Sequence, residues 1–238
     1  MIAVLTCDII ASRIYTDVQR QALDTQLRIA FKASCLALPQ AEADYLSFSI
    51  IQGDEFQFSL ESPAFFYHFL LMFRNLLAIG SLTPWGYPSL KADFVNTETN
   101  PLHSLMPCFR AGIGIGTRSI TAKANSYQMD GSAYHHSRTS MHNFEHSLNK
   151  HRLTIFHSDN PFVASSLNTI LMFCDSIEQE WSERQRLAIF YTLEANSSLQ
   201  TAIKMGVSRQ NVEKLLKSAN WDLICRSMDY FAAAEWLN

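Results

Sequence analysis

The chain has few of the residues that make tight turns, with 8 glycines and 7 prolines among 238 residues. Sandwiches and barrels built from many short strands need such residues at their frequent turns, so this scarcity argues against both folds. The charge is also nearly balanced, since 22 acidic and 19 basic residues leave a net charge of −3. This balance excludes a uniformly basic protein of the chromatin type, and the 47% hydrophobic content excludes an intrinsically disordered chain.

Cysteine is sparse as well, and its 5 copies are odd in number and lack C-x-x-C spacing. This pattern argues against a disulfide framework or a zinc knuckle and favours reduced, partly buried thiols. The most hydrophobic run, Pro63 to Ile79, is about a turn too short for a bilayer span and contains Arg74. We therefore expect a buried helix and no membrane partner. The first residues lack the basic region and cleavage site of a signal peptide, so we expect a cytoplasmic location.

Hydrophobic periodicity predicts alternating strands and helices in the first 160 residues. In chain order the expected elements are a strand, a helix, a β-hairpin, a helix, a strand, a helix and a last strand, over 2–8, 18–38, 46–60, 62–79, 108–115, 130–147 and 153–156. An antiparallel sheet with helices on one face, of the ferredoxin-like kind, accommodates this order, and the predicted fold class is α+β. Residues 81–106 hold prolines without periodicity, which indicates an inserted loop.

The pattern changes after Pro161, because only helical periodicity continues from there to the end of the chain. We therefore expect two domains, an α+β domain over 1–160 and an all-α domain over 161–238. Residues 182–220 carry 6 basic and 3 acidic residues, which gives this segment a local charge of +3. The whole-chain charge thus conceals a basic region in the second domain.

Residues 201–221, TAIKMGVSRQNVEKLLKSANW, have a helix-turn-helix pattern with Gly206 in the turn. The surrounding segment 182–221 resembles the region-4 domain of sigma factors. That resemblance places the start of the second helix of the motif in the major groove of double-stranded DNA. The candidate DNA-binding residues, with Arg, Gln and Asn facing bases and Lys facing phosphates, are Ser208, Arg209, Gln210, Asn211, Lys214 and Lys217. Dimerisation or protein docking is the alternative role of such a motif.

Acidic residues end neighbouring strands of the predicted sheet. Asp8 follows the first strand, Asp54 lies in the hairpin turn, and Glu55 comes directly after it. Because these strands are neighbours in a ferredoxin-like sheet, we expect the carboxylates to converge. Two carboxylates beside an open face suit Mg²⁺ or Mn²⁺, with Glu55 as a third oxygen donor. The alternative for Asp54 is stabilisation of the turn itself.

The glycines of the GIGIG segment, Gly112, Gly114 and Gly116, lie along a predicted strand rather than at the start of a helix. They therefore mark places where the backbone of another element approaches closely. Arg110, just before them, either pairs with an acid across the sheet or belongs to a functional site. His142 and His146, four residues apart, favour a solvated helix surface over a zinc site, because no H-E-x-x-H motif is present.

Four segments carry a family resemblance in their order and spacing. They are DIIASR at 8–13, GDEF at 53–56, RAGIGIG at 110–116 and GSAYHHSR at 131–138. Together they resemble the blocks of the class III nucleotidyl cyclase domain, a palm fold. With the helical tail, the layout is most similar to the SatD family of bacterial proteins.

The resemblance implies roles for residues of all these segments. Asp8 and Asp54 would bind metal and act in catalysis with Arg138, which would stabilise phosphoryl charge. The residues implied in cofactor binding, mainly by a backbone cradle for phosphates, are Ile9, Ile10, Ala11, Ser12, Gly53 and Tyr134. Ile50 and Tyr134 stand where purine cyclases have a base-reading Lys and an Asn, so base recognition and transition-state stabilisation are altered.

These modules together predict a cytoplasmic regulator that acts as a homodimer. In it, a palm-like domain that binds a nucleotide and Mg²⁺ or Mn²⁺ is coupled to a DNA-binding helix-turn-helix. Two alternatives stay open. One is a metal-dependent nucleotidyl cyclase or nucleotidyltransferase that acts on nucleoside triphosphates. The other is a non-catalytic interaction scaffold.

Overall fold

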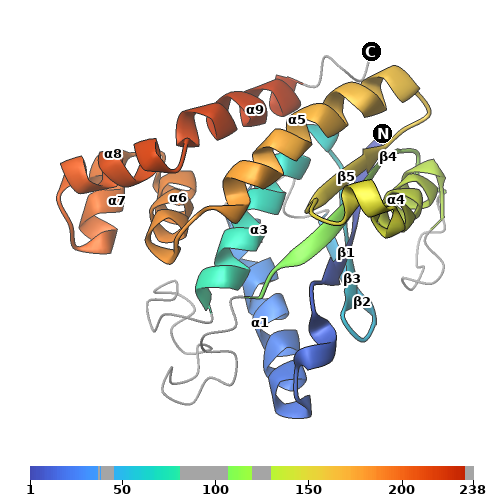
Figure 1. Cartoon of the computed structure of the whole chain (residues 1–238), viewed down its shortest axis with the longest axis horizontal. Coiled ribbons are helices and arrows are strands. Elements are labelled where there is room, and N and C mark those ends of the chain that lie inside the picture. Colours follow the sequence, from blue (N-terminus) through green and yellow to red (C-terminus); the bar gives the residue numbers. More distant parts are fainter. Residues whose placement is uncertain (37, 39–45, 81–106, 120–129, 234–238) are drawn as a thin grey trace.

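The computed structural model describes residues 1–36, 38, 46–80, 107–119 and 130–233 (Figure 1). The predicted inserted loop over 81–106 lies outside the described residues. The strands are β1 (Ile2–Ile9), β2 (Ser47–Gln52), β3 (Glu55–Leu60), β4 (Phe109–Gly116) and β5 (Thr154–His157). The helices are α1 (Asp17–Leu36), α3 (Phe66–Gly80), α4 (Ser132–His142), α5 (Pro161–Gln179), α6 (Glu183–Ala195), α7 (Ser198–Met205), α8 (Arg209–Ser218) and α9 (Trp221–Ala233).

The described strands form one five-stranded sheet with the order β2-β3-β1-β4-β5. β1 runs antiparallel to both β3 and β4, and β2 and β3 form the predicted antiparallel hairpin. β5 instead pairs with β4 in parallel, so the expectation of a purely antiparallel sheet is wrong at this edge. The reason is that α4 connects the two strands and returns the chain to the end of the sheet from which β4 started. The chain is thus a mixed α+β protein.

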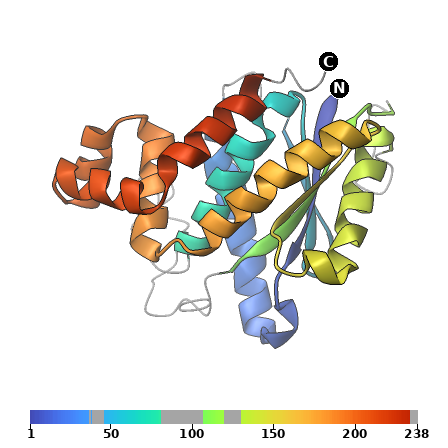
Figure 2. The same ribbon diagram turned by 45° about the horizontal axis from the view of Figure 1, so that its top comes forward.

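Helices cover both faces of the sheet, whereas the sequence led us to expect them on one face. Leu5 and Cys7 of β1 point into the large core shared with α1 and α3. The alternate residues point the other way, where Val4 packs under α4 and the hydroxyl of Thr6 lies 2.9 Å from that of Ser137. Figure 2 shows α4 on the opposite side of the sheet from α1 and α3.

The glycines of β4 explain how α4 lies so close to the sheet. A Cβ atom on Gly114 would come within 2.2 Å of the carbonyl oxygen of Ala133, and one on Gly112 within 2.6 Å of that of Ser137. The backbones of the helix and the strand therefore meet with no side chain of these glycines between them. The prediction that the GIGIG segment marks a close backbone approach is confirmed.

Helix α3 is buried over 66–79 apart from the partly exposed His68, as its sequence predicts. It packs against α1, α6 and α9 of the same chain, and the ring of Phe66, just inside it, lies 5.1 Å from that of Phe231 on α9. No helix among the described residues is long and apolar enough to span a membrane. Figure 1 shows the last helices at one end of the molecule, with α9 returning beside α5.

A buried ionic network joins α3 to α5 and β5. Nη1 of Arg74 lies 3.3 Å from a carboxylate oxygen of Glu178 and 3.8 Å from one of Asp175. Nη2 of Arg74 donates to the carbonyl oxygen of Leu153 at 2.7 Å, and Asp175 accepts from the backbone N–H groups of Leu153 and Thr154. We call Arg74, Asp175 and Glu178 the buried ionic clamp. A buried charge is tolerated only when it is paired in this way.

The clamp continues into the first helix of the tail. Arg186 of α6 donates from Nη2 to the carbonyl oxygen of Glu178 at 2.7 Å and from Nη1 to the side chain of Asn75 at 3.4 Å. Leu167 and Leu171 of α5 belong to the same hydrophobic core as the sheet. The domain boundary after residue 160 stays a prediction, but the core is continuous across it.

Substituting Gly114 by Ala should destabilise the fold by about 3 kcal/mol or more, because the added methyl group meets backbone atoms of α4 that cannot rotate away. Urea unfolding followed by circular dichroism measures this loss. Ser119→Ala, an exposed change just beyond β4, is the control and should shift the free energy of unfolding very little. Equal stability of the two variants would contradict the close packing of α4.

Burial raises the pKa of Asp175 to about 6, and the attraction of Arg74 opposes that rise. The folded state therefore binds this proton more tightly than the unfolded state, and the stability from Asp175 increases as the pH falls through about 6. Relative to Asp175→Asn, the wild type should gain about 1 kcal/mol in free energy of unfolding between pH 7.5 and pH 5. Denaturant titrations at the two pH values measure the gain, and a constant difference would refute it.

Candidate functional site

The acids predicted from the sequence meet where β1 ends beside the hairpin. Asp8 is opposite Glu55 on one side and Arg110 on the other in the register of the sheet. The N–H group of Ile9 donates to the carbonyl oxygen of Asp54 at 3.3 Å, which holds the hairpin turn against the end of β1. The predicted convergence of Asp8 and Asp54 is therefore present in the structure, whereas Glu55 does not complete a group of three metal ligands among the described residues.

The surroundings of Asp8 combine burial with charges of both signs. Burial raises the pKa of this carboxyl group, and the neighbouring Asp54 raises it further. The hydrogen bond from Arg110 opposes both effects, since Nη2 of Arg110 lies 2.9 Å from Oδ2 of Asp8. One of the two readings of Arg110, a pairing with an acid across the sheet, is thus confirmed.

Glu55, the third acidic residue at this end of the sheet, lies near the positive charge of Arg138. Burial and then the charge of Asp8 raise the pKa of Glu55, whereas Arg138 and His142 lower it. Arg138 and His142 both extend from α4, so the helix held against the glycines of β4 brings positive charge toward the acids. Arg138 itself is exposed to solvent.

Fewer backbone N–H groups are free for the predicted phosphate cradle than the sequence suggested. The N–H group of Ile9 is occupied by Asp54, and that of Ile10 donates to the carbonyl oxygen of Cys108 at 2.9 Å. These two groups therefore cannot bind phosphate, which is a correction. Ala11 adopts a left-handed backbone conformation with φ of 57°, and the 3-10 helix η1 (Ser12–Ile14) begins directly after it. The cradle is thereby limited to the backbone of Ala11 and Ser12.

A pocket of about 140 Å³ opens beside these residues, between α1 and the β2–β3 hairpin. Ser12, Gly53 and Asp54 of the predicted site line it. Its other lining residues are Tyr15, Arg20, Leu23, Asp24, Leu27 and Ile50. Ile50, which stands at the base-reading position of the cyclase resemblance, therefore faces the same space as the predicted metal ligand Asp54.

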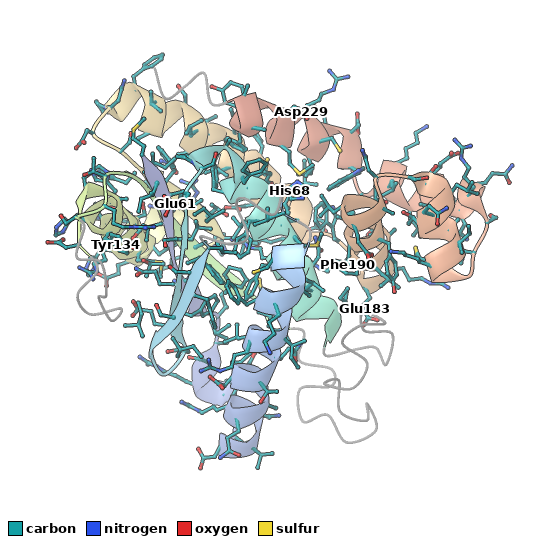
Figure 3. The ribbon with its side chains drawn as sticks, turned by 180° about the vertical axis from the view of Figure 1, so that it is seen from behind. Glu61, His68, Tyr134, Glu183, Phe190 and Asp229 are labelled. Carbon is teal, nitrogen blue, oxygen red and sulfur yellow. The ribbon has the colours of Figure 1, made fainter. Side chains whose placement is uncertain are left out.

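Tyr134 lies apart from this pocket. Its side chain is fully buried on the α4 side of the sheet, in a small cluster with Ile2, Val4 and Ala133. Figure 3 shows Tyr134 on α4, on the part of the molecule that also holds Glu61. The structure therefore gives Tyr134 a packing role, and its assignment to cofactor binding is corrected.

The sequence did not identify Arg20 and Asp24 as site residues. Both belong to a helix whose amphipathic pattern can be read, but no motif shows that its exposed polar face meets a pocket. Their spacing of four residues places them on one helix face, and that was the only available signal. Only the position of the hairpin relative to α1 shows that this face is part of the site.

The donor set fits a hydrated divalent cation that also contacts a ligand. Among the described residues, no group of three or more His, Cys, Asp and Glu side chains could hold a metal ion by itself. Mg²⁺ is commonly held by one or two carboxylates, with water and substrate phosphate completing its octahedral shell. Asp8 and Asp54 supply that number, and a cation would relieve the repulsion between them that raises the pKa of Asp8.

Two helices joined by a short turn, α7 and α8, lie where the sequence predicts a helix-turn-helix. α7 ends at Gly206, whose φ of 64° turns the chain, and the Ser208 side chain caps α8 by accepting from the N–H group of Asn211 at 3.2 Å. Val212 is fully buried and anchors α8 to the other helices. All six candidate DNA-binding residues are exposed, and Arg209 forms a 2.7 Å ion pair with Glu213.

The structure also shows how the two spaced histidines and the cysteines are placed. α4 ends at His142, so His142 and His146 do not share a helix face, and both are exposed as expected. The five cysteines are free thiols.

Comparison of the chain with protein-family models, with curated proteins and with solved structures finds no match.

Proposed function

We propose that the chain binds a nucleotide together with Mg²⁺ or Mn²⁺ where β1 meets the hairpin, and that its helix-turn-helix binds double-stranded DNA. The observation that carries the proposal is the convergence of Asp8 and Asp54 next to a pocket lined by Ser12 and Gly53. A cation on these carboxylates would screen the phosphates of the nucleotide. A homodimer and a cytoplasmic location stay predictions.

The topology supports this proposal. The first six elements follow the order β-α-β-β-α-β, and the strands β2-β3-β1-β4 are all antiparallel neighbours. This is the arrangement of a ferredoxin-like palm domain, which we propose as the finer description of the sheet. In this arrangement the metal ligands come from the end of the central strand β1 and from the adjacent hairpin.

Continuity between the sheet and the tail supports a regulatory role. The buried ionic clamp fastens α5 to α3 and β5, and Arg186 ties α6 to the same group. The indole N–H of Trp181, just before α6, donates to the carbonyl oxygen of Ala219 beyond α8 at 2.8 Å. These direct contacts are a route by which a change in the packing of the sheet domain would reach the exposed helices.

Nucleotide binding should be lost when Asp54 becomes Asn, because the metal then keeps only one of its two carboxylates. Wild type with Mg²⁺ and a nucleoside triphosphate at a hundred times its dissociation constant should gain about 2.7 kcal/mol of stability, read from thermal unfolding. Asp229→Asn, an equal charge change on α9 far from the hairpin (Figure 3), should keep this gain. No stabilisation of the wild type by any nucleotide would refute the proposal.

The same samples separate a regulator from an enzyme. Chromatography after incubation with nucleoside triphosphates and Mn²⁺ should show the nucleotides unchanged if the chain only binds them. A new product that Asp54→Asn fails to make would instead identify a nucleotidyl cyclase or nucleotidyltransferase.

DNA binding should weaken when Lys214 and Lys217 of α8 become Ala. The variant would make fewer phosphate contacts and would therefore release fewer counterions from the DNA. The slope of log affinity against log salt should become shallower by about 0.9 for each contact removed. Gel shifts over a salt series measure this slope. The double variant Lys32→Ala/Lys150→Ala, which removes two exposed lysines outside the tail, serves as the charge-matched control. Unaltered affinity and slope in the α8 double variant would show that α8 does not contact DNA.

A further inference from the structure

The pocket between α1 and the hairpin has an apolar part and a polar rim. Leu23, Leu27 and Ile50 supply the apolar wall, and the two leucines are almost completely buried. Arg20 and Asp24 stand on the same face of α1 as the leucines, because positions i, i+3, i+4 and i+7 of a helix align. One helix face thus presents a cation, an anion and two apolar side chains to a single space.

The size of the pocket suits a planar ring. A protein cavity of about 150 Å³ holds a benzene ring, and this pocket measures about 140 Å³. A nucleobase ring lying between the leucines of α1 and Ile50 would have its edge beside Asp24. The rest of a nucleotide would extend past Ser12 and Asp54 at the mouth.

The carboxylate of Asp24 can be released to a ligand at little cost. In the structure both of its oxygens accept from Arg28 one turn later, at 3.0 Å and 3.3 Å. Both side chains are about half exposed, at 57% for Arg28 and 47% for Asp24. Pairs of this kind on a helix surface contribute little stability, so a ligand that offers two N–H groups can replace Arg28.

We propose that this pocket selects guanine, with Asp24 accepting hydrogen bonds from the N1–H and N2–H groups of the base; this inference rests on the proposed nucleotide binding. An ionised carboxylate has two acceptor oxygens and no donor. Guanine offers two adjacent donors on its pairing edge. Adenine, cytosine and uracil each present one donor beside an acceptor on that edge, which a carboxylate repels.

Arg20 supplies the positive charge at the part of the pocket where the phosphates of a nucleotide would lie. Its Nε donates to the carbonyl oxygen of Tyr15 at 3.2 Å, and its Nη2 lies 3.5 Å from that of Ser12. These contacts hold the guanidinium beside the backbone of Ala11 and Ser12, the remaining phosphate cradle. Its other N–H groups suit the oxygens of a phosphate, which guanidinium groups bind with paired hydrogen bonds.

Isothermal titration of the full chain with Mg²⁺ and GTP, ITP or ATP tests the selection. GTP should bind about tenfold more tightly than ATP, since one charged hydrogen bond and one repulsive contact separate them. ITP, which keeps N1–H and lacks the N2 amino group, should fall between them. Asp24→Asn should bring the GTP and ATP affinities within about twofold, because the amide offers only one acceptor oxygen. Arg28→Gln, which breaks the ion pair and keeps the carboxylate, should retain or increase the preference for GTP.

The outcomes distinguish the two proposals. Equal binding of GTP and ATP by the wild type refutes guanine selection and leaves nucleotide binding intact. A preference for GTP that survives Asp24→Asn shows that another group selects the base, which also refutes the inference. Failure of every nucleotide to bind overturns both.

Discussion

The rest of the structure depends on the pairing of Arg74 inside the core. This side chain is 4% exposed in a helix that is otherwise almost entirely hydrophobic, so its charge must be compensated within the chain. Asp175 and Glu178 of α5 compensate it, and their remaining oxygens bind the backbone of β5 and the hydroxyl of Tyr67. Because each partner would be left with an unpaired buried charge if the other moved, α3, α5 and the edge strand have one relative position.

Most of the secondary structure could be predicted from local patterns, since strands, helices and the hairpin follow from periodicity and from turn residues such as Gly53 and Gly206. What could not be predicted depends on which elements meet. The same apolar run that predicts a buried helix over 62–79 says nothing about the acids that neutralise Arg74, because they lie about a hundred residues later in the chain. The side of the sheet taken by α4 follows from packing against the glycines of β4, and the parallel placement of β5 follows from the return of the chain through α4; local patterns in separate segments reveal neither.

The same distinction separates the site residues that could be predicted from those that could not. Asp8 and Asp54 could be identified because Asp8 lies near the end of a strand and Asp54 lies in the turn of the hairpin that neighbours that strand once the sheet order is assumed. Ile9, Ile10 and Tyr134 were misassigned, since their sequence positions match a family block while their N–H groups or side chains are occupied by the fold. Arg20 and Asp24 were missed because helix spacing alone does not show which surface a helix shares with a pocket.

The close contact between α4 and β4 has a mechanical consequence for the site. With no side chain of Gly112 or Gly114 to act as a compressible layer, the helix and the strand behave as one rigid body. Arg138 on α4 and Arg110 on β4 therefore have a fixed spacing from each other. The pocket lies on the other side of the sheet, and its lining among the described residues comes from 12–27 and from the hairpin rather than from α4 or β4. The side chains that would distinguish one ligand from another, Asp24 and Ile50, therefore belong to elements outside this rigid unit.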